Sequence, residues 1–184
     1  MAKNVYLFLA EGCEECEALI TVDILRRGGV DVTTVSISDS EYITSSHNIT
    51  FKADAKLSEI NKDAADMLIL PGGMPGTNNL MACKELTDLV VKYNTAGKRI
   101  AAVCAAPTIF GQLGLLNGKR ATCFKGMEDK LTGAIVSEEQ VVTDGTITTS
   151  RGLGTTIPFA LELLKLLVSE EAANMISSKI IYTA

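Results

Sequence analysis

The 184-residue chain contains no tryptophan and a single histidine, His47, so a reaction that needs two histidines of one chain is excluded. No apolar run approaches the ~20 residues that a membrane-spanning helix requires. Glu11 interrupts the short apolar stretch near the N-terminus, which predicts a first strand rather than a signal peptide. We therefore expect a cytoplasmic protein that does not bind membranes.

Basic side chains are also too few to outweigh the acidic ones. The sequence has 17 Lys and Arg against 22 Asp and Glu, which gives a net charge of −5 and disfavours nonspecific binding to nucleic acid. The five cysteines are an odd number without a signal peptide, and this favours reduced thiols over a disulfide framework. The length fits one domain, residues 1–184, with a sizeable core.

Strand patterns alternate with helical patterns along the chain. Strands are expected at 5–9, 30–37, 67–70 and 100–103, and helices at 16–28, 86–96, 157–167 and from the Cys104 turn to about 113. Residues 42–56 are expected to form a hairpin or an edge excursion, and residues 141–149 a hairpin. This alternation predicts an α/β sandwich with a mostly parallel central sheet. Functional sites of such sheets lie beyond the carboxyl ends of the strands, so loops 10–17, 71–76, 104–107 and 151–155 are expected to converge.

Cys104 is the most informative residue. It ends the apolar run 100–103, which is typical of a strand buried on both faces, and Pro107 fits the first turn of a following helix. A cysteine at such a turn lies where helix N–H groups favour the thiolate, as in a nucleophile elbow. A single buried cysteine more often only fills space, so this interpretation depends on the other loops.

Two of those loops carry candidate partners for the sulfur. Gly72 and Gly73 follow a predicted strand, and their amides could donate to an anionic intermediate, although a tight structural turn explains them as well. Glu17 lies at the start of the first predicted helix. A carboxyl desolvated beside a thiolate has a raised pKa and can shuttle a proton, so Glu17 is the candidate acid and base.

Three other features have simpler explanations. Cys13 and Cys16 form a Cys-x-x-Cys pair, but one such pair is not a zinc site, and the two glutamates between them disfavour a redox-active thiolate. His47 is expected at the surface or at an interface. Arg151 lies in a Gly-rich loop that either places a cation near an anionic group or merely precedes a helix. The sequence predicts no metal site.

Five segments together resemble the ThiJ/PfpI superfamily, and within it the DJ-1 branch that includes protein deglycases. They are residues 10–17 (AEGCEECE), 22–27 (VDILRR), 70–73 (LPGG), 101–107 (AAVCAAP) and 149–155 (TSRGLGT). Each segment alone is weak evidence for the superfamily. Their order and spacing together are specific for it, and the resemblance extends over essentially the whole chain. The resemblance implies a flavodoxin-like three-layer sandwich and a homodimer.

The resemblance also implies roles for individual residues. Cys104 matches the family's reactive, oxidation-sensitive cysteine, and Glu17 matches the buried glutamate that hydrogen-bonds to it. Gly73 and Ala105 match the positions whose amides form an anion pocket, to which Gly72 is added here.

Other matching positions concern the surroundings of the cysteine and include two departures from the family. Arg27 and Arg151 match arginines near the dimer contact and the site, and His47 falls where relatives often carry an arginine that reaches the partner's site. Protease-like members have a histidine where this chain has Ala105, which disfavours a peptidase. Phe124 occupies the place of a second family histidine.

Taken together, the resemblance implies a cysteine-dependent glyoxalase or protein deglycase that needs no cofactor. Its substrates would be methylglyoxal, glyoxal and their early adducts. The alternative is an oxidative-stress sensor or redox-regulated chaperone with little turnover, in which Cys104 is oxidised to the sulfinate. Both functions need an activated thiol, so we expect the pKa of Cys104 to lie well below the ordinary value of about 8.5.

Overall fold

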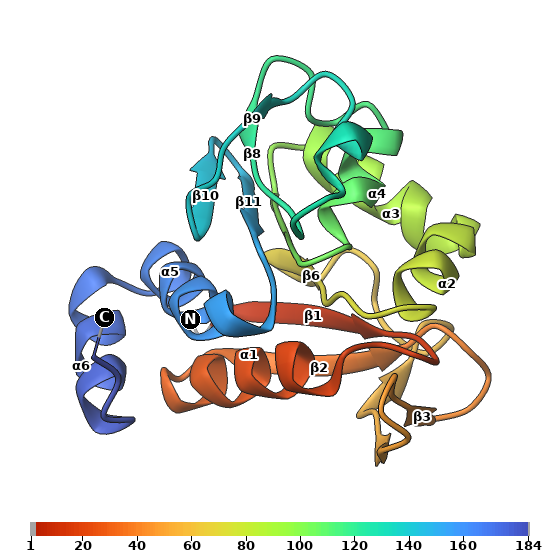
Figure 1. Cartoon of the computed structure of the whole chain (residues 1–184). Coiled ribbons are helices and arrows are strands. Elements are labelled where there is room, and N and C mark those ends of the chain that lie inside the picture. The colour runs from red at the N-terminus through yellow and green to blue at the C-terminus, as the bar shows by residue number, and fades with distance from the viewer. Residues whose placement is uncertain (1–2, 184) are drawn as a thin grey trace.

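The computed structural model describes residues 3–183, and its centre is a seven-stranded sheet in the order β10-β11-β7-β6-β1-β2-β5 (Figure 1). The strands are β1 (Asn4–Leu9), β2 (Asp31–Ser36), β5 (Ala55–Lys56), β6 (Met67–Leu70), β7 (Arg99–Val103), β10 (Val141–Asp144) and β11 (Ile147–Ser150). All neighbouring pairs are parallel except β10 and β11. The predicted mostly parallel sheet is therefore confirmed.

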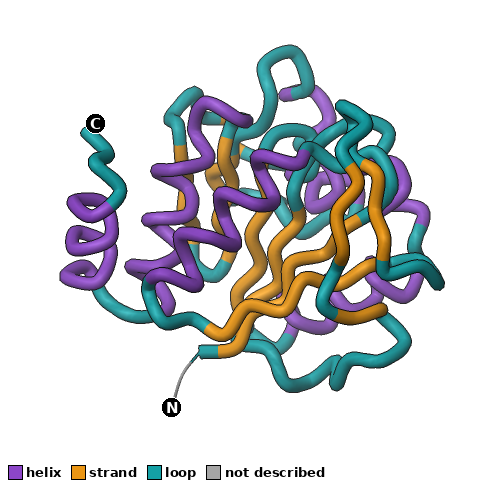
Figure 2. Tube along the Cα trace, turned by 90° about the horizontal axis from the view of Figure 1, so that it is seen from below, coloured by secondary structure: helices purple, strands orange, loops and turns teal. Residues whose placement is uncertain are grey.

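Helices cover both faces of the sheet and make the expected three layers (Figures 1 and 2). One face carries α1 (Glu15–Arg27) and α5 (Thr156–Leu167), with α6 (Glu170–Lys179) packed on the outside of α5. The other face carries α2 (Gly76–Ala82), α3 (Lys84–Thr95) and α4 (Pro107–Gln112). None of the helices within residues 3–183 has the length and apolar character needed to cross a membrane.

The strands bury their side chains on both faces because each face is covered by helices. In β1, Tyr6 and Phe8 join the core under α2, α3 and α4, whereas Val5, Leu7 and Leu9 join the core under α1 and α5. Strands β6 and β7 follow the same pattern, and their apolar residues are almost fully buried. Their continuous apolar runs are thus the direct consequence of a central position in a parallel sheet.

The smaller elements partly match the expectations. In the segment expected to be a hairpin or an edge excursion, strands β3 (Tyr42–Thr44) and β4 (Thr50–Lys52) form a hairpin, and the end of the segment, β5, joins the edge of the main sheet. The hairpin β10–β11 is confirmed, and Ser169 caps the N-terminus of α6 by accepting a hydrogen bond from the Ala172 N–H. Helix α2, strands β8 (Arg120–Ala121) and β9 (Ile135–Val136), and the short 3-10 helices η1 (Glu128–Lys130) and η2 (Leu153–Thr155) were not predicted from the sequence.

Helix α4 lies very close to the segment that follows η1. A Cβ atom added to Gly111 would lie 2.3 Å from the Lys130 carbonyl oxygen, and backbone cannot move aside as a flexible side chain can. We expect Gly111→Ala to lower the free energy of unfolding by about 1–3 kcal/mol through overpacking. Urea unfolding measures this, with Gly154→Ala as the matched control because its Cβ would meet no atom within 4 Å. Equal stability of the two variants would contradict the close packing.

Candidate functional site

Cys104 lies on the sharp turn between β7 and α4. Its φ is +65°, a value that non-glycine residues rarely adopt and that is enriched at functional sites. Main-chain hydrogen bonds hold it there: its N–H donates to the Ser150 carbonyl at 3.0 Å, and its carbonyl accepts from the Phe124 N–H at 2.7 Å. Pro107 begins α4, as the sequence predicts. The cysteine is therefore fixed by its neighbours in a conformation that lifts its side chain from the sheet.

Glu17 is the closest acidic partner of that sulfur. It lies in the first turn of α1 and is only 1% exposed. Its Oε2 accepts a hydrogen bond from the Gly72 N–H at 2.9 Å, and its carboxyl is also hydrogen-bonded to Cys104. The structure thus brings Cys104 and Glu17 together from segments 87 positions apart in the sequence (104 − 17 = 87).

Burial raises the pKa of both members of this pair. Loss of water raises the pKa of Glu17 to about 7, although its hydrogen bonds to Cys104 and Gly72 oppose the shift. Loss of water, followed by the negative charge of Glu17, raises the pKa of Cys104 to about 12. Between these two pH values the pair holds one proton and one negative charge.

The expectation that Cys104 has a low thiol pKa is therefore wrong. It considered the helix N–H groups and omitted the loss of water around the sulfur, which is the larger cause, and the repulsion between two neighbouring anions. When the shared proton lies on Glu17, that repulsion is absent and the carboxylic acid can donate a hydrogen bond to the sulfur. The thiolate is then stabilised by the pair rather than by the helix alone.

The three amides predicted to form an anion pocket divide into two groups. The amides of Gly73 and Ala105 act on the sulfur and lower the pKa of Cys104, which is the effect expected of donors to a negative atom. The Gly72 amide instead donates to the Glu17 carboxyl. The expectation that the Gly72 amide donates to an oxyanion is therefore corrected. This amide instead holds the Glu17 carboxyl in place.

Glycine at positions 72 and 73 is required by close packing. A Cβ on Gly72 would lie 2.6 Å from the Cβ of Cys104 and 2.7 Å from Glu17 Oε2, so it would separate the pair. Gly73 has a φ of +89°, and a Cβ there would lie 2.3 Å from the Glu14 backbone nitrogen. The loop after β6 thus approaches the elbow and the start of α1 as bare backbone.

Cys104 opens into a cavity of about 460 Å³. All four of the loops expected to converge contribute to it, together with two further segments, the β3–β4 turn and the chain around 124–127. The lining residues are Glu14, Glu17, Ser46, His47, Gly73, Met74, Cys104, Ala105, Phe124, Met127 and Leu153. Met74, Met127 and Leu153 carry no sequence signal for a site, because single apolar residues in loops have no periodicity.

The remaining predicted site residues lie outside the Cys104–Glu17 pair. His47 lines the cavity, and its Nδ1 lies 3.0 Å from Glu15 Oε1, which raises the pKa of the imidazole. Arg27 ends α1, at the opposite end from Glu17, and pairs with Asp23 at 2.6 Å. Arg151 faces Glu128 at 3.9 Å. Neither arginine is among the residues that line the cavity of this chain.

The Cys13-x-x-Cys16 pair does not form an activated dithiol. Cys13 is fully buried, and burial raises the pKa of its thiol to about 12. Burial and the neighbouring glutamates also raise the pKa of Cys16. A raised pKa lowers the thiolate population, so this motif fits a structural role better than a redox role.

One further group of potential metal ligands lies at the cavity mouth. Glu14, Glu15 and His47 bring ligand atoms within 4.8 Å of one another. Hydrogen bonds within the chain already account for them, since Glu14 accepts from the Glu17 N–H and caps α1, and Glu15 pairs with His47.

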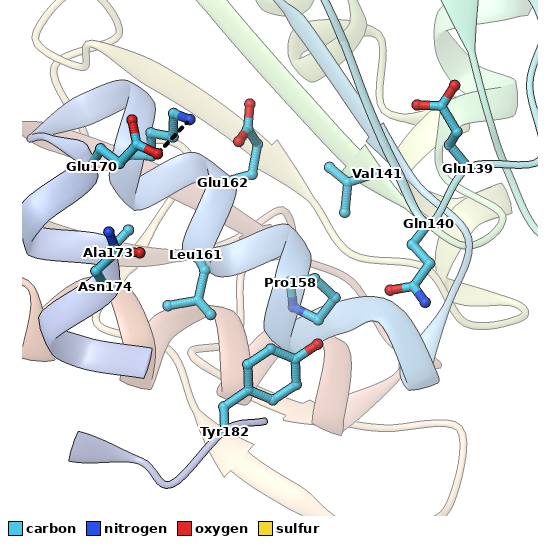
Figure 3. A pocket seen from close by; sticks show the side chains of 11 residues that line it. Glu139, Gln140, Val141, Pro158, Leu161, Glu162, Glu170, Ala173, Asn174 and Tyr182 are labelled. Carbon is cyan, nitrogen blue, oxygen red and sulfur yellow. Dashed lines mark ion pairs between the residues drawn. The ribbon is translucent and has the colours of Figure 1, made fainter. Parts of the chain in front are cut away.

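A separate cavity of about 500 Å³ lies between the segment before β10 and helices α5 and α6 (Figure 3). In Figure 3 the ring of Tyr182 is directed toward Pro158, and the side chains of Glu139, Glu162 and Glu170 also line the cavity. No cysteine lines this cavity. The candidate site is therefore the Cys104 cavity, where a thiol and a buried carboxyl meet.

Comparisons with known proteins agree with this architecture. The model of the DJ-1/PfpI family matches residues 3–166. The chain is 41% identical over 181 residues to "Protein DJ-1 homolog B" of Arabidopsis thaliana, covering 97% of this chain but 41% of the relative, so it spans less than half of that protein. It is 32% identical to "Glutathione-independent glyoxalase DJR-1.2" of Caenorhabditis elegans, over 89% of this chain and 88% of that one.

A solved structure extends the likeness to three dimensions. "Toxoplasma gondii DJ-1, oxidized" superposes with a TM-score of 0.95 at 33% identity, and the match covers 100% of both chains. The family model, the relatives and the solved structure all identify the same family. This chain belongs to the DJ-1/PfpI family.

Proposed function

We propose that the protein is a cysteine-dependent glyoxalase of the deglycase type that converts methylglyoxal, glyoxal and their early adducts to 2-hydroxy acids without a cofactor. The observation that carries this proposal is the pair of half-buried Cys104 and buried Glu17, which holds one proton at the wall of a 460 Å³ cavity. A relative that carries the name of a glyoxalase supports the reaction class.

In the first step the proton of the Cys104 thiol passes to the Glu17 carboxylate as the sulfur reacts, since the thiol is the group with the higher pKa. The Cys104 sulfur attacks the aldehyde carbon, and the electron pair of the C=O bond moves to oxygen. Glu17 donates its proton to that oxygen and becomes a carboxylate, which gives a hemithioacetal. The amides of Gly73 and Ala105, which already act on the sulfur, stabilise the negative charge that develops nearby.

The second step moves hydrogen between adjacent carbons. The Glu17 carboxylate removes the proton from the former aldehyde carbon, and an enediolate forms. Glu17 then returns the proton to the neighbouring carbon while the hydroxyl proton passes between the two oxygens, which gives the lactoyl thioester of Cys104. Water hydrolyses the C–S bond, so that methylglyoxal and water yield lactate with no external oxidant or reductant.

The rest of the cavity favours this reaction over peptide hydrolysis. No base other than Glu17 hydrogen-bonds to the thiol in residues 3–183, because Ala105 follows the cysteine and His47 is paired with Glu15. Phe124, Met127 and Leu153 make part of the wall apolar. A small dicarbonyl needs only a thiol and one acid that can also act as a base.

Oxidation sensing is a second candidate, favoured by the same pKa shift. A sulfinate on Cys104 would be permanently anionic, and a Glu17 carboxyl with a pKa of about 7 can still donate a hydrogen bond to it near neutrality. Two equivalents of peroxide convert the thiol to the sulfinic acid and release two of water. In this function the protein reports oxidant exposure instead of turning over an aldehyde.

Replacement of Cys104 tests the catalytic role. We expect Cys104→Ala to abolish lactate formation from methylglyoxal, because no other activated thiol lines the cavity. Lactate is measured enzymatically in a buffer free of amines and thiols that scavenge aldehydes. Cys83→Ala, at a half-buried thiol outside the cavity, should keep full activity. Turnover retained by Cys104→Ala would reject the proposal.

The proton on Glu17 should be visible in the pH dependence of stability. An ordinary glutamate loses its proton near pH 4.5, whereas folded Glu17 keeps it to about 7, so the folded state binds more protons in between. This stabilisation is complete below about pH 4.5 and is lost as the pH rises through about 7, by up to about 3 kcal/mol.

Glu17→Gln should remove this loss, because a neutral amide does not titrate. Urea unfolding at pH 5 and pH 8 measures the difference, and the exposed Glu138→Gln variant should keep the wild-type dependence. An equal decrease in Glu17→Gln and wild type would show that Glu17 is not the titrating group.

Mild peroxide treatment separates the two candidate functions. Intact-mass measurement should show a gain of two oxygen atoms that is lost in Cys104→Ala. That gain together with negligible methylglyoxal turnover would support the sensor, whereas turnover that falls in step with oxidation would support the enzyme. No oxygen gain at Cys104 would remove the sensor from consideration.

A further inference from the structure

His47 is the only residue lining the Cys104 cavity, within residues 3–183, that can carry a positive charge. The other lining side chains are apolar, uncharged or acidic, and the acidic ones belong to Glu14 and Glu17. His47 reaches the cavity from the turn between β3 and β4, whereas Glu17 reaches it from the first turn of α1. The cavity therefore contains an acid–base group that the Cys104–Glu17 pair does not include.

Main-chain hydrogen bonds fix the turn that carries His47. Asn48 adopts a φ of +60°, a left-handed conformation that asparagine tolerates better than most residues, and its N–H donates to the Ser45 carbonyl at 3.1 Å. The Ser46 N–H donates to the Cys13 carbonyl at 2.9 Å, which joins the turn to the segment that leads into α1. The imidazole thus starts from a defined backbone position beside the start of that helix.

Glu15 orients the imidazole ring. His47 Nδ1 lies 3.0 Å from Glu15 Oε1 and 3.1 Å from Oε2, and it carries the proton because a carboxylate can only accept. Glu15 is 6% exposed; loss of water opposes its charge, but hydrogen bonds from its own N–H, His47 and Ser45 lower its pKa. A buried carboxylate therefore occupies Nδ1, which leaves Nε2 for a ligand in the cavity.

The same carboxylate favours the charged form of the ring. The hydrogen bond to Glu15 and its negative charge raise the pKa of His47; loss of water opposes this effect and the charge of Glu14 adds to it. These two glutamates, both at the start of α1, are the charged groups that act on the ring within residues 3–183. In the imidazolium form Nε2 also bears a proton and can donate it. The side chain is 66% exposed, so it can exchange protons with water.

We propose that His47 is the catalytic residue that carries a proton between the two oxygens of the substrate. This role rests on the proposed function, in which Glu17 carries the proton between the two carbons. As Glu17 removes the carbon-bound proton, the electron pair moves to the oxygen of the second carbon, and Nε2–H donates its proton there. The neutral imidazole then takes the hydroxyl proton of the first carbon while Glu17 protonates the second. The lactoyl thioester has formed, His47 is again an imidazolium, and Glu17 is again a carboxylate.

The other polar groups in the wall are unsuited to this transfer. Glu17 Oε2 accepts from the Gly72 N–H, and the carboxyl already carries the proton that moves between the carbons. The Glu14 carboxylate caps α1 by accepting from the Glu17 N–H, and an anion has no proton to donate. A serine hydroxyl, such as that of Ser46, is a weak acid and a weak base near neutrality. Among the described lining residues, His47 alone can both donate and accept at that pH.

The pH dependence of kcat/KM for methylglyoxal tests this role between pH 5 and pH 10. Ionisation of Glu17 should give a limb that rises through about pH 7, and the Cys104 thiol, with a pKa of about 12, titrates beyond this range. His47 should add a limb that falls as the pH rises through its own pKa, because a neutral imidazole has no proton for the second oxygen.

His47→Gln should remove the falling limb and lower kcat about a hundredfold, since glutamine can still donate to Glu15 but does not titrate. The control is Lys52→Gln, which removes a cation from the same hairpin that is paired with Glu41 outside the cavity. This variant should keep both limbs. A falling limb that persists in His47→Gln would overturn the assignment.

Because His47 is the only histidine of the chain, ¹⁵N NMR of its ring reports its protonation without overlap. The midpoint of this titration in the free protein should coincide with the falling limb of kcat/KM. Glu15→Gln keeps an acceptor for Nδ1 but removes the charge that raises the pKa, so both midpoints should move together to lower pH. A limb that stays in place while the NMR midpoint moves would show that another group causes it.

A probe that does not react separates this role from the proposed function. Acetohydroxamate has two adjacent oxygens, as the enediolate has, and it should shift the ring ¹⁵N signals of His47 more than acetamide does. Turnover by wild type with an unchanged pH profile in His47→Gln would reject the role of His47 and leave the proposed function intact. Absence of turnover by wild type would reject the proposed function and the catalytic role together, even if acetohydroxamate still shifts the signals. Equal shifts with the two probes would reject an Nε2 contact with the second oxygen.

Discussion

The site depends on one buried hydrogen bond, from the Gly72 amide to the carboxyl of Glu17. It holds the carboxyl under the Cys104 sulfur, away from water, and it needs a residue without a side chain because a Cβ would occupy the space between the two groups. The parallel sheet makes this arrangement possible, since β6 and β7 end side by side and α1 begins at the same edge. The proton shared by the pair, and with it both candidate functions, follows from that placement.

Much of the fold could be predicted because central strands and long helices have distinctive patterns. Residues 67–70 and 100–103 are continuous apolar runs, and these are the central strands β6 and β7. The convergence of the loops at Glu17, Gly73, Cys104 and Leu153 follows from strand direction alone. Short elements were missed, such as α2, because a helix of seven residues that begins after Pro-Gly signals resembles a turn.

The sequence was less informative about direction and charge within the site. It placed Gly72 in the correct loop, but only coordinates show that its amide points to Glu17. It gave the sign of the Glu17 pKa shift correctly and that of Cys104 incorrectly, because burial of the sulfur and the charge of Glu17 outweigh the main-chain amides that lower the pKa of the thiol. His47 was expected at the surface or at an interface, and it is exposed and pairs with Glu15 beside the cavity. The homodimer and the cytoplasmic location stay predictions of the sequence.

The loops around the cavity are joined chiefly by main-chain hydrogen bonds. Gly76 donates to the Gly12 carbonyl at 3.0 Å, Gly12 donates to the Thr44 carbonyl at 2.8 Å, and Ser46 donates to the Cys13 carbonyl at 2.9 Å. Such a framework does not depend on side-chain identity but depends strictly on chain length. Insertions and deletions should therefore be excluded from these turns, while the side chains that they carry remain free to diversify and change what the cavity accepts.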